Sequence, residues 1–124
     1  MNWEAGIPMA FPSANVYMRM HWAKQKKLKA QWKQILSLMF AAVPHAAKKR
    51  RVNIIRMGSR LLDYGNLWLG ADKIIFDSLV DLELLVDDNT TWIDPSIEQI
   101  KVKRKEERTV IQIYESDTDA TPQP

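Results

Sequence analysis

Apolar residues recur at helical intervals in two segments of the chain. The first segment spans about 21–43, and its apolar stripe comprises Leu28, Trp32, Ile35, Leu36, Met39 and Val43. The second begins at 63–66 and runs to about 82, with a stripe of Leu67, Ala71, Ile74, Ile75 and Leu79. Steps of three and four residues place each stripe on one face of an amphipathic helix. The pattern therefore predicts two helices, and Pro44 ends the first of them.

Polar residues in the second helix also follow helical intervals. Asn66, Gly70, Lys73 and Asp77 lie four, three and four positions apart. This spacing predicts one polar ridge that carries an amide, a cation and a carboxylate beside the apolar stripe.

Strand-like segments account for most of the remaining chain. β-branched or alternating residues occupy 52–57, 97–104 and 108–115, and a short edge strand is predicted over 7–11, before a turn at Pro12 and Ser13. Residues 105–107 can turn between the last two strands, which predicts a C-terminal hairpin. The order of elements predicts an α+β domain over 1–115, with a small mixed sheet covered on one face by two helices. We expect 116–124 to be a disordered polar tail.

Composition excludes several classes of protein. The 124 residues fit one domain, and the absence of Cys rules out disulfides, thiolate zinc sites and Cys nucleophiles. No apolar run reaches the roughly 20 residues that a membrane span needs, and the N-terminus does not resemble a secretory signal. We therefore expect a soluble cytoplasmic protein with no membrane partner.

The net charge of +3 conceals a strong asymmetry. Residues 1–60 carry twelve Lys and Arg against one acid, Glu4, and the remainder carries six basic and fourteen acidic residues, so the halves have net charges of +11 and −8. Nucleic-acid phosphates attract Lys and Arg, whereas a divalent cation attracts carboxylates. The alternative is that the two halves neutralise each other within one domain. The candidate phosphate-binding residues are Arg19, Lys24, Lys26, Lys27, Lys29, Lys33, Lys48, Lys49, Arg50, Arg51 and Arg60.

Candidate chemistry is restricted to carboxylates. The two histidines, His21 and His45, form no ligand motif, and the four glycines form no phosphate-binding loop. The remaining candidates are Asp63, Asp72, Asp77, Asp81, Asp87 and Asp88. Asp63 has the position of a helix cap, and Asp87 and Asp88 are typical of a solvated turn. Alternatively, a loop that folds back could bring both ends of the helix to one Mg²⁺.

The chain contains a set of spaced motifs: Leu62-Asp63-Tyr64-Gly65-Asn66-Leu67, Gly70, Lys73, Asp77-Ser78-Leu79 and Asp87-Asp88, with Pro12-Ser13, Asn15, Arg19 and His21-Trp22-Ala23 near the N-terminus. This set resembles the RusA family of Holliday junction resolvases, including members from phages and prophages. The resemblance covers about 8–115. It implies a homodimer that resolves four-way DNA junctions in recombination and repair by Mg²⁺-dependent hydrolysis, with Mn²⁺ as a substitute, encoded by a bacterium or its phage.

The resemblance also implies roles for individual residues. Asp63, Asn66, Lys73 and Asp88 match the family's catalytic positions, and Asp63 and Asp88 would hold the metal. We add Asp87 to them as a predicted metal ligand. Lys73 would stabilise charge on the scissile phosphate.

One position departs from the family pattern. Gly65 stands where the family has a second motif aspartate, and Asp72 or Asp87 is a candidate replacement. The alternative function is therefore a branched-DNA-binding protein with weakened catalysis. A third candidate function is that of a small interaction protein, in which the basic half of one subunit pairs with the acidic half of another.

Overall fold

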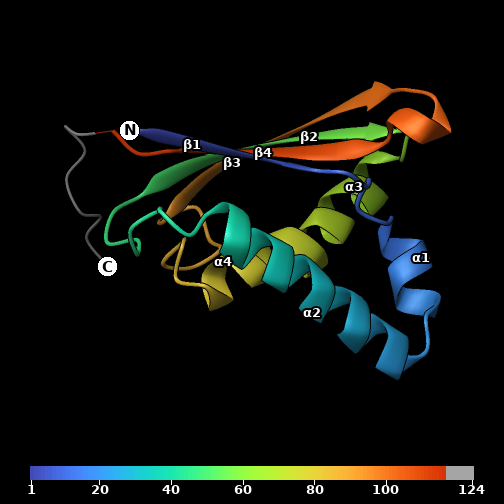
Figure 1. The fold of residues 1–124 in the computed structure, drawn as a ribbon, viewed down its shortest axis with the longest axis horizontal. Helices are drawn as coiled ribbons and strands as arrows, with labels where there is room; N and C mark the ends of the chain where they lie inside the picture. The colour runs from blue at the N-terminus through green and yellow to red at the C-terminus, as the bar shows by residue number, and fades with distance from the viewer. Residues whose placement is uncertain (117–124) are drawn as a thin grey trace.

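A computed structural model describes residues 1–116, and the predicted tail at 117–124 lies outside the described residues. A four-stranded sheet forms one layer, and the α-helices lie on one side of it (Figure 1). The strands are β1 (Asn2–Ile7), β2 (Arg50–Gly58), β3 (Ile93–Lys101) and β4 (Arg108–Tyr114). The α+β class and the small mixed sheet are thus confirmed.

The sheet does not contain the predicted C-terminal hairpin. The order is β1-β4-β2-β3, in which β4 pairs antiparallel with β1 and β2, and β2 pairs parallel with β3. The predicted hairpin between the last two strands is therefore wrong, because β3 and β4 lie on opposite sides of β2. Instead of a tight turn, residues 102–107 carry the chain past the end of β2, with Val102 N–H donating to the Gly58 carbonyl and a short 3-10 turn, η2 (Arg104–Glu106).

The first strand also lies elsewhere than predicted. β1 occupies 2–7 rather than 7–11, although it is an edge strand as expected. Pro8 lacks the N–H that a further ladder bond requires, so the strand stops before it. Ser13 then caps an unpredicted helix, α1 (Ala14–Arg19), because its Oγ accepts from the Val16 N–H at 3.1 Å.

The two predicted helices are present with changed boundaries. α2 spans Trp22–Met39 and ends before Pro44, because Phe40 already leaves the helical conformation. The second helix is continuous over 64–81 but has three parts: α3 (Tyr64–Ala71), a π-helical turn η1 (Asp72–Phe76) and α4 (Asp77–Asp81). Within the described residues, no helix combines the length and apolarity needed to cross a membrane.

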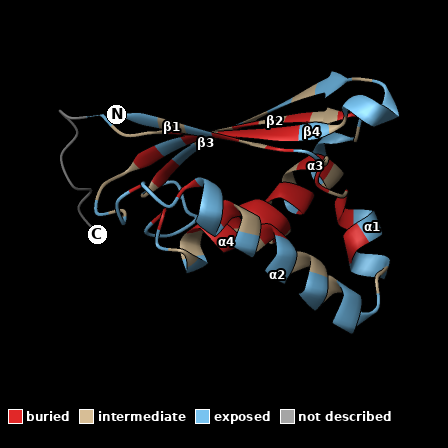
Figure 2. Cartoon of the chain, viewed as in Figure 1, coloured by how far each residue is buried: buried red, intermediate tan, exposed pale blue. Residues whose placement is uncertain are grey.

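The core lies between the sheet and the helices, where Figure 2 shows the buried positions. Trp32 and Leu36 of α2, Ile74 and Ile75 of η1, and Ile54 of β2 are fully buried. The apolar residues of η1 therefore pack into this core, whereas its polar residues Asp72 and Lys73 are only partly buried.

Candidate metal and nucleic-acid site

The π-helical turn determines where two carboxylates lie. The Asp77 N–H donates to the Asp72 carbonyl, a bond from residue i+5 to residue i that defines the wider π turn. At 3.6 residues per turn, residues five apart would differ by about 140° around a regular α-helix and face apart. The wider turn reduces this angle, so Asp72 and Asp77 present their carboxylates to the same side.

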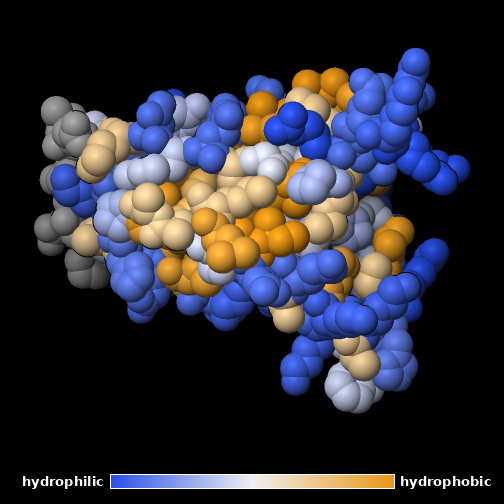
Figure 3. All heavy atoms as spheres, viewed as in Figure 1, coloured by the Kyte–Doolittle hydropathy of each residue, from blue (hydrophilic) through white to orange (hydrophobic). Residues whose placement is uncertain are grey.

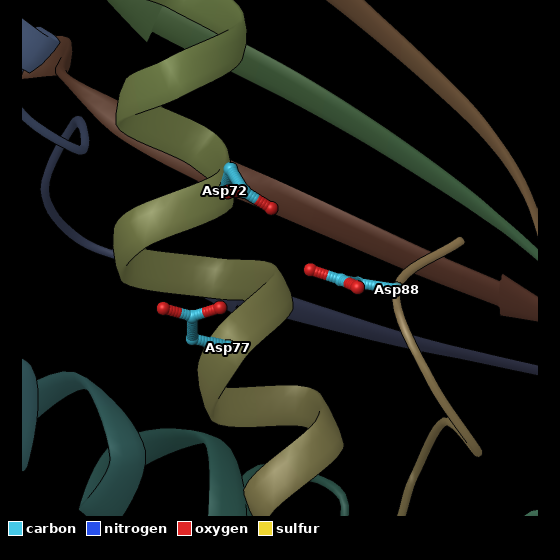
Figure 4. Close-up of side chains that lie close together, drawn as sticks. All are labelled: Asp72, Asp77 and Asp88. Atoms are coloured by element: carbon cyan, nitrogen blue, oxygen red, sulfur yellow. The ribbon is translucent and has the colours of Figure 1, made fainter.

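Asp88 reaches this side of the helix from the following loop. Glu83 adopts a left-handed conformation with φ of 61°, and the N–H groups of Leu84 and Leu85 both donate to the Leu79 carbonyl. Both leucines are buried. These contacts end the helix and turn the chain back, so that Asp88 lies opposite Asp72 (Figure 4).

Three carboxylates therefore form one group, the acidic cluster of Asp72, Asp77 and Asp88. One oxygen from each lies within 4.8 Å of the other two. Burial raises the pKa of Asp72, and the negative charges of Asp77 and Asp88 raise it further. The cluster therefore carries negative charge that its own surroundings only partly compensate.

Two cations lie beside the acidic cluster. The positive charge of Lys73 opposes the rise in the pKa of Asp72. From α2, Lys29 Nζ lies 3.1 Å from Asp77 Oδ2, and each side chain is 35% exposed. One turn further along both helices, Lys33 pairs with Asp81 at 3.7 Å. The basic helix is thus held directly against the acidic one.

Asp63 has the capping role that its position suggested. Its Oδ1 accepts from Asn66 Nδ2 at 2.6 Å, and its Oδ2 accepts from the Asn66 N–H at 3.3 Å. These hydrogen bonds hold the pKa of Asp63 below its ordinary value. Asn66 also accepts from the Asn15 N–H at 2.9 Å, which ties α1 to α3. Asp63 is not a member of the acidic cluster.

Asp87, the other predicted metal ligand, also lies outside the acidic cluster. Its Oδ1 accepts from the Asp88 N–H at 2.8 Å and its Oδ2 from Asn89 Nδ2 at 3.3 Å. These bonds shape the turn that presents Asp88. Of the three predicted ligands, only Asp88 belongs to the acidic cluster, and Asp72, the suggested replacement, lies beside Asp88.

The predicted polar ridge is not continuous. Gly70 is buried, and a Cβ there would lie 2.5 Å from the Pro12 carbonyl oxygen, so this position is a packing contact with the segment that leads into α1. The π turn then displaces Asp77 from the line through Asn66 and Lys73. Periodicity in the sequence assumes a constant 3.6 residues per turn and could not detect this change.

A groove adjoins the acidic cluster. It has a volume of about 370 Å³, and its apolar lining comprises Trp68, Leu69, Phe76, Ile93 and Pro95. Asp72, Asp88 and Gly65 complete the lining. A Cβ at Gly65 would meet Asp63 Oδ2 at 3.7 Å, an ordinary contact, so there is room for a side chain at the position where the resemblance expects a carboxylate.

The predicted phosphate-binding residues separate into free and committed groups. Arg50 was wrongly included, because it is 1% exposed and donates to the Leu84 and Pro44 carbonyls at 2.9 and 3.0 Å. Lys29 and Lys33 are tied to α4, and Arg51 pairs with Asp94 at 3.2 Å. The exposed candidates are Arg19, Lys24, Lys26, Lys27 and Arg60, whereas Lys48 and Lys49 are half-buried.

The two charged halves neutralise each other in part. Within 1–116, each ion pair that the structure contains joins the basic half to the acidic half, as Lys29–Asp77, Lys33–Asp81 and Arg51–Asp94 illustrate. Figure 3 shows hydrophilic side chains around the lower right of the molecule, where α2 begins in Figure 1. The exposed lysines of α2, together with Arg19 and Arg60, therefore remain available to an anion.

Comparison with known proteins does not extend this description. No family model and no curated protein matches the chain.

Proposed function

We propose that this protein is a divalent-metal-dependent endonuclease that cuts four-way DNA junctions, as the RusA resemblance implies. The observation that carries the proposal is the π turn, which places the carboxylates of Asp72 and Asp77 close to that of Asp88. π turns inside α-helices frequently occur at functional sites. Asp88 is also the acid that the resemblance independently nominates.

The donor set suits a hard divalent cation. Mg²⁺ takes carboxylate oxygens at about 2.0–2.1 Å, so two ligands on opposite sides of the ion lie about 4.2 Å apart. Adjacent ligands lie closer, about 3 Å apart. The oxygens of Asp72, Asp77 and Asp88 lie within 4.8 Å of one another, so side-chain rotation would have to draw them together around the ion. Bound there, Mg²⁺ or Mn²⁺ supplies an activated water and stabilises charge on the phosphate.

The remaining site residues support this chemistry from the protein side. Lys73 lies next to Asp72 in sequence and is half-buried, which suits a cation that stabilises charge on the scissile phosphate. Asp63 and Asn66 hold the beginning of α3 and connect it to α1. They position the groove wall that carries Gly65 and Trp68.

Exposed cations on α2 provide the DNA-binding surface. Lys24, Lys26 and Lys27 lie on the same helix that contacts Asp77 through Lys29. Phosphate contacts of this kind fix position without reading sequence and weaken steeply with salt. A homodimer suits a four-way junction, because two related strands are cut and the substrate has two-fold symmetry.

The test is strand nicking of a synthetic four-way junction with Mg²⁺ or Mn²⁺. Asp88→Asn is expected to abolish nicking while junction binding persists. Asp81→Asn is the matched control, because Asp81 lies on α4 four residues after Asp77 but outside the acidic cluster. Equal nicking by the native protein and Asp88→Asn would remove the acidic cluster from the chemistry.

The second candidate function is a junction-binding protein with weakened catalysis. Gly65 favours it, because this position lacks the carboxylate that the resemblance expects although the structure has room for one. Tight junction binding by the native chain without nicking, together with nicking by Gly65→Asp, would establish this alternative. Failure to retain a junction even at low salt would exclude both functions.

A further inference from the structure

We propose that the groove beside the acidic cluster binds a single unstacked nucleobase of the DNA substrate. This inference rests on the proposed function and adds a part of the substrate that the acidic cluster cannot recognise. The groove is defined by Trp68, Phe76, Ile93 and Pro95, together with Asp72 and Asp88.

The chemistry of the lining selects a flat, neutral group. Five of the eight residues that line the groove are apolar, one of them an indole and another a phenyl ring, and none of the eight is Lys or Arg. A phosphate would find no cation there and two carboxylates. A base presents an apolar face to the half-buried ring of Trp68, and stacking on aromatic side chains is the usual way in which proteins hold unpaired bases.

The indole of Trp68 contacts both the core and a neighbouring ring. Its inner part packs against the hydrophobic core, and the Tyr64 ring lies against it with centroids 5.8 Å apart. Tyr64 itself is 76% exposed. A stacking surface that is already ordered loses little further entropy when a base binds.

The two carboxylates place the groove within one nucleotide of the proposed metal. Asp72 and Asp88 belong both to the acidic cluster and to the groove lining. Only one sugar separates a base from its own phosphate, so a nucleotide whose phosphate faces the acidic cluster can place its base in the groove. The amino and imino groups of a base can also donate to whichever carboxylate oxygens remain free.

The same carboxylates disfavour a protein side chain as the occupant. An apolar side chain from a second copy would remove Asp72 and Asp88 from water without supplying a donor, which is costly for charged groups. A base supplies donors at its edge and an apolar surface on its faces. Such a site would favour branched DNA, since bases are least costly to unstack where pairing is already interrupted.

The experiment is a double-mutant cycle between Trp68 and the nucleotides around the branch. Junctions carrying one abasic residue at each successive position near the branch are bound with Ca²⁺ in place of Mg²⁺, so that affinity is measured apart from cleavage. One position is expected to weaken binding to the native protein about 5- to 150-fold. Trp68→Ala is expected to bind the intact junction more weakly than the native protein does, by the same factor. Its affinity should not fall further when the junction carries that abasic residue. Trp68→Phe retains most of the affinity.

Two further variants make the result specific. Leu69 lines the groove and is 44% exposed, so Leu69→Asp introduces a charge without opening the core and reports the same coupling if Trp68→Ala does not fold. Trp22→Ala removes a 69% exposed Trp from α2, outside the groove lining, and is expected to leave the abasic effect unchanged.

Three outcomes would overturn the inference. In the first, Trp68→Ala and the abasic residue reduce junction affinity additively while the native protein still nicks the junction. This result rejects the base site and leaves the proposed function standing. A native dimer that becomes monomeric in Trp68→Ala identifies the groove as a subunit interface instead. A native protein that retains no junction at low salt rejects the proposed function together with this inference.

Discussion

Two glycines of α3 provide a matched test of how this helix packs. Neither adopts a positive φ, so neither needs the conformational freedom of glycine. At Gly70, an added Cβ would lie 2.5 Å from the Pro12 carbonyl oxygen and 3.2 Å from the Ala14 nitrogen, both backbone atoms. At Gly65, the nearest atom would be Asp63 Oδ2 at 3.7 Å. The same substitution to Ala should therefore act in opposite directions at the two positions.

The magnitudes follow from packing and helix propensity. Ala in place of Gly in an exposed helix position stabilises by about 0.5–1 kcal/mol, and Gly65→Ala should gain about this amount. Gly70→Ala has the same propensity gain, but the contact with Pro12 is about 1 Å too short. Overpacking of this kind costs about 1–3 kcal/mol, so we expect a net loss of about 1–2 kcal/mol.

Thermal and urea denaturation of the two variants and the native protein measure this difference. For a domain of this size we expect Tm to rise by about 2–4 °C in Gly65→Ala and to fall by about 4–8 °C in Gly70→Ala. Shifts of the same sign would refute the close contact between α3 and the segment that leads into α1.

Three further predictions concern charged groups. Lys29→Met should tighten Mn²⁺ binding about 3- to 5-fold, because an ammonium 3.1 Å from Asp77 competes with the ion. Lys33→Met, the control, should change Mn²⁺ affinity less than about 2-fold. Equal effects of the two substitutions in a Mn²⁺ titration would contradict this prediction. Arg50→Met should destabilise by about 2–4 kcal/mol in urea, because it removes two hydrogen bonds and leaves Glu115 without its buried partner, whereas Arg51→Met should cost no more than about 0.5 kcal/mol. Because the pKa of Asp72 is raised above its unfolded value of 3.8, ionising it destabilises the native state, and this penalty develops as pH rises through and above that value. Asp72→Asn should therefore be more stable than the native protein near about pH 7 and equal to it near about pH 3, and a constant difference in denaturation midpoint between these pH values would contradict the assignment.

In the second helix, the spacing of apolar residues predicted the structure better than the spacing of polar residues did. The stripe from Leu67 to Leu79 correctly located a helix that packs on the sheet. The same periodicity failed for the polar residues, because it assumed a constant rise and rotation through η1. Burial of consecutive residues Ile74, Ile75 and Phe76 accompanies the wider turn, and only packing against the sheet reveals it.

The charged residues show a similar division. Their distribution correctly separated a basic half from an acidic half, but charge alone cannot say which cations remain free. Arg50 lies within a basic run and is nevertheless buried, because β2 directs its side chain inward. There it donates hydrogen bonds to two backbone carbonyls and pairs with Glu115. Arg51, its neighbour, points to the opposite face of the sheet, as alternation along a strand requires.

The sequence by itself determined the class of fold, the two main helices and the nature of the candidate chemistry, because these depend on local periodicity and on which side chains are present. The tertiary structure alone decided strand order and the membership of the acidic cluster. Both depend on contacts between residues distant in the chain: β4 inserts between β1 and β2, and a loop returns Asp88 to the π turn that carries Asp72 and Asp77. No local pattern encodes such contacts, since their energy arises only once the intervening chain has folded.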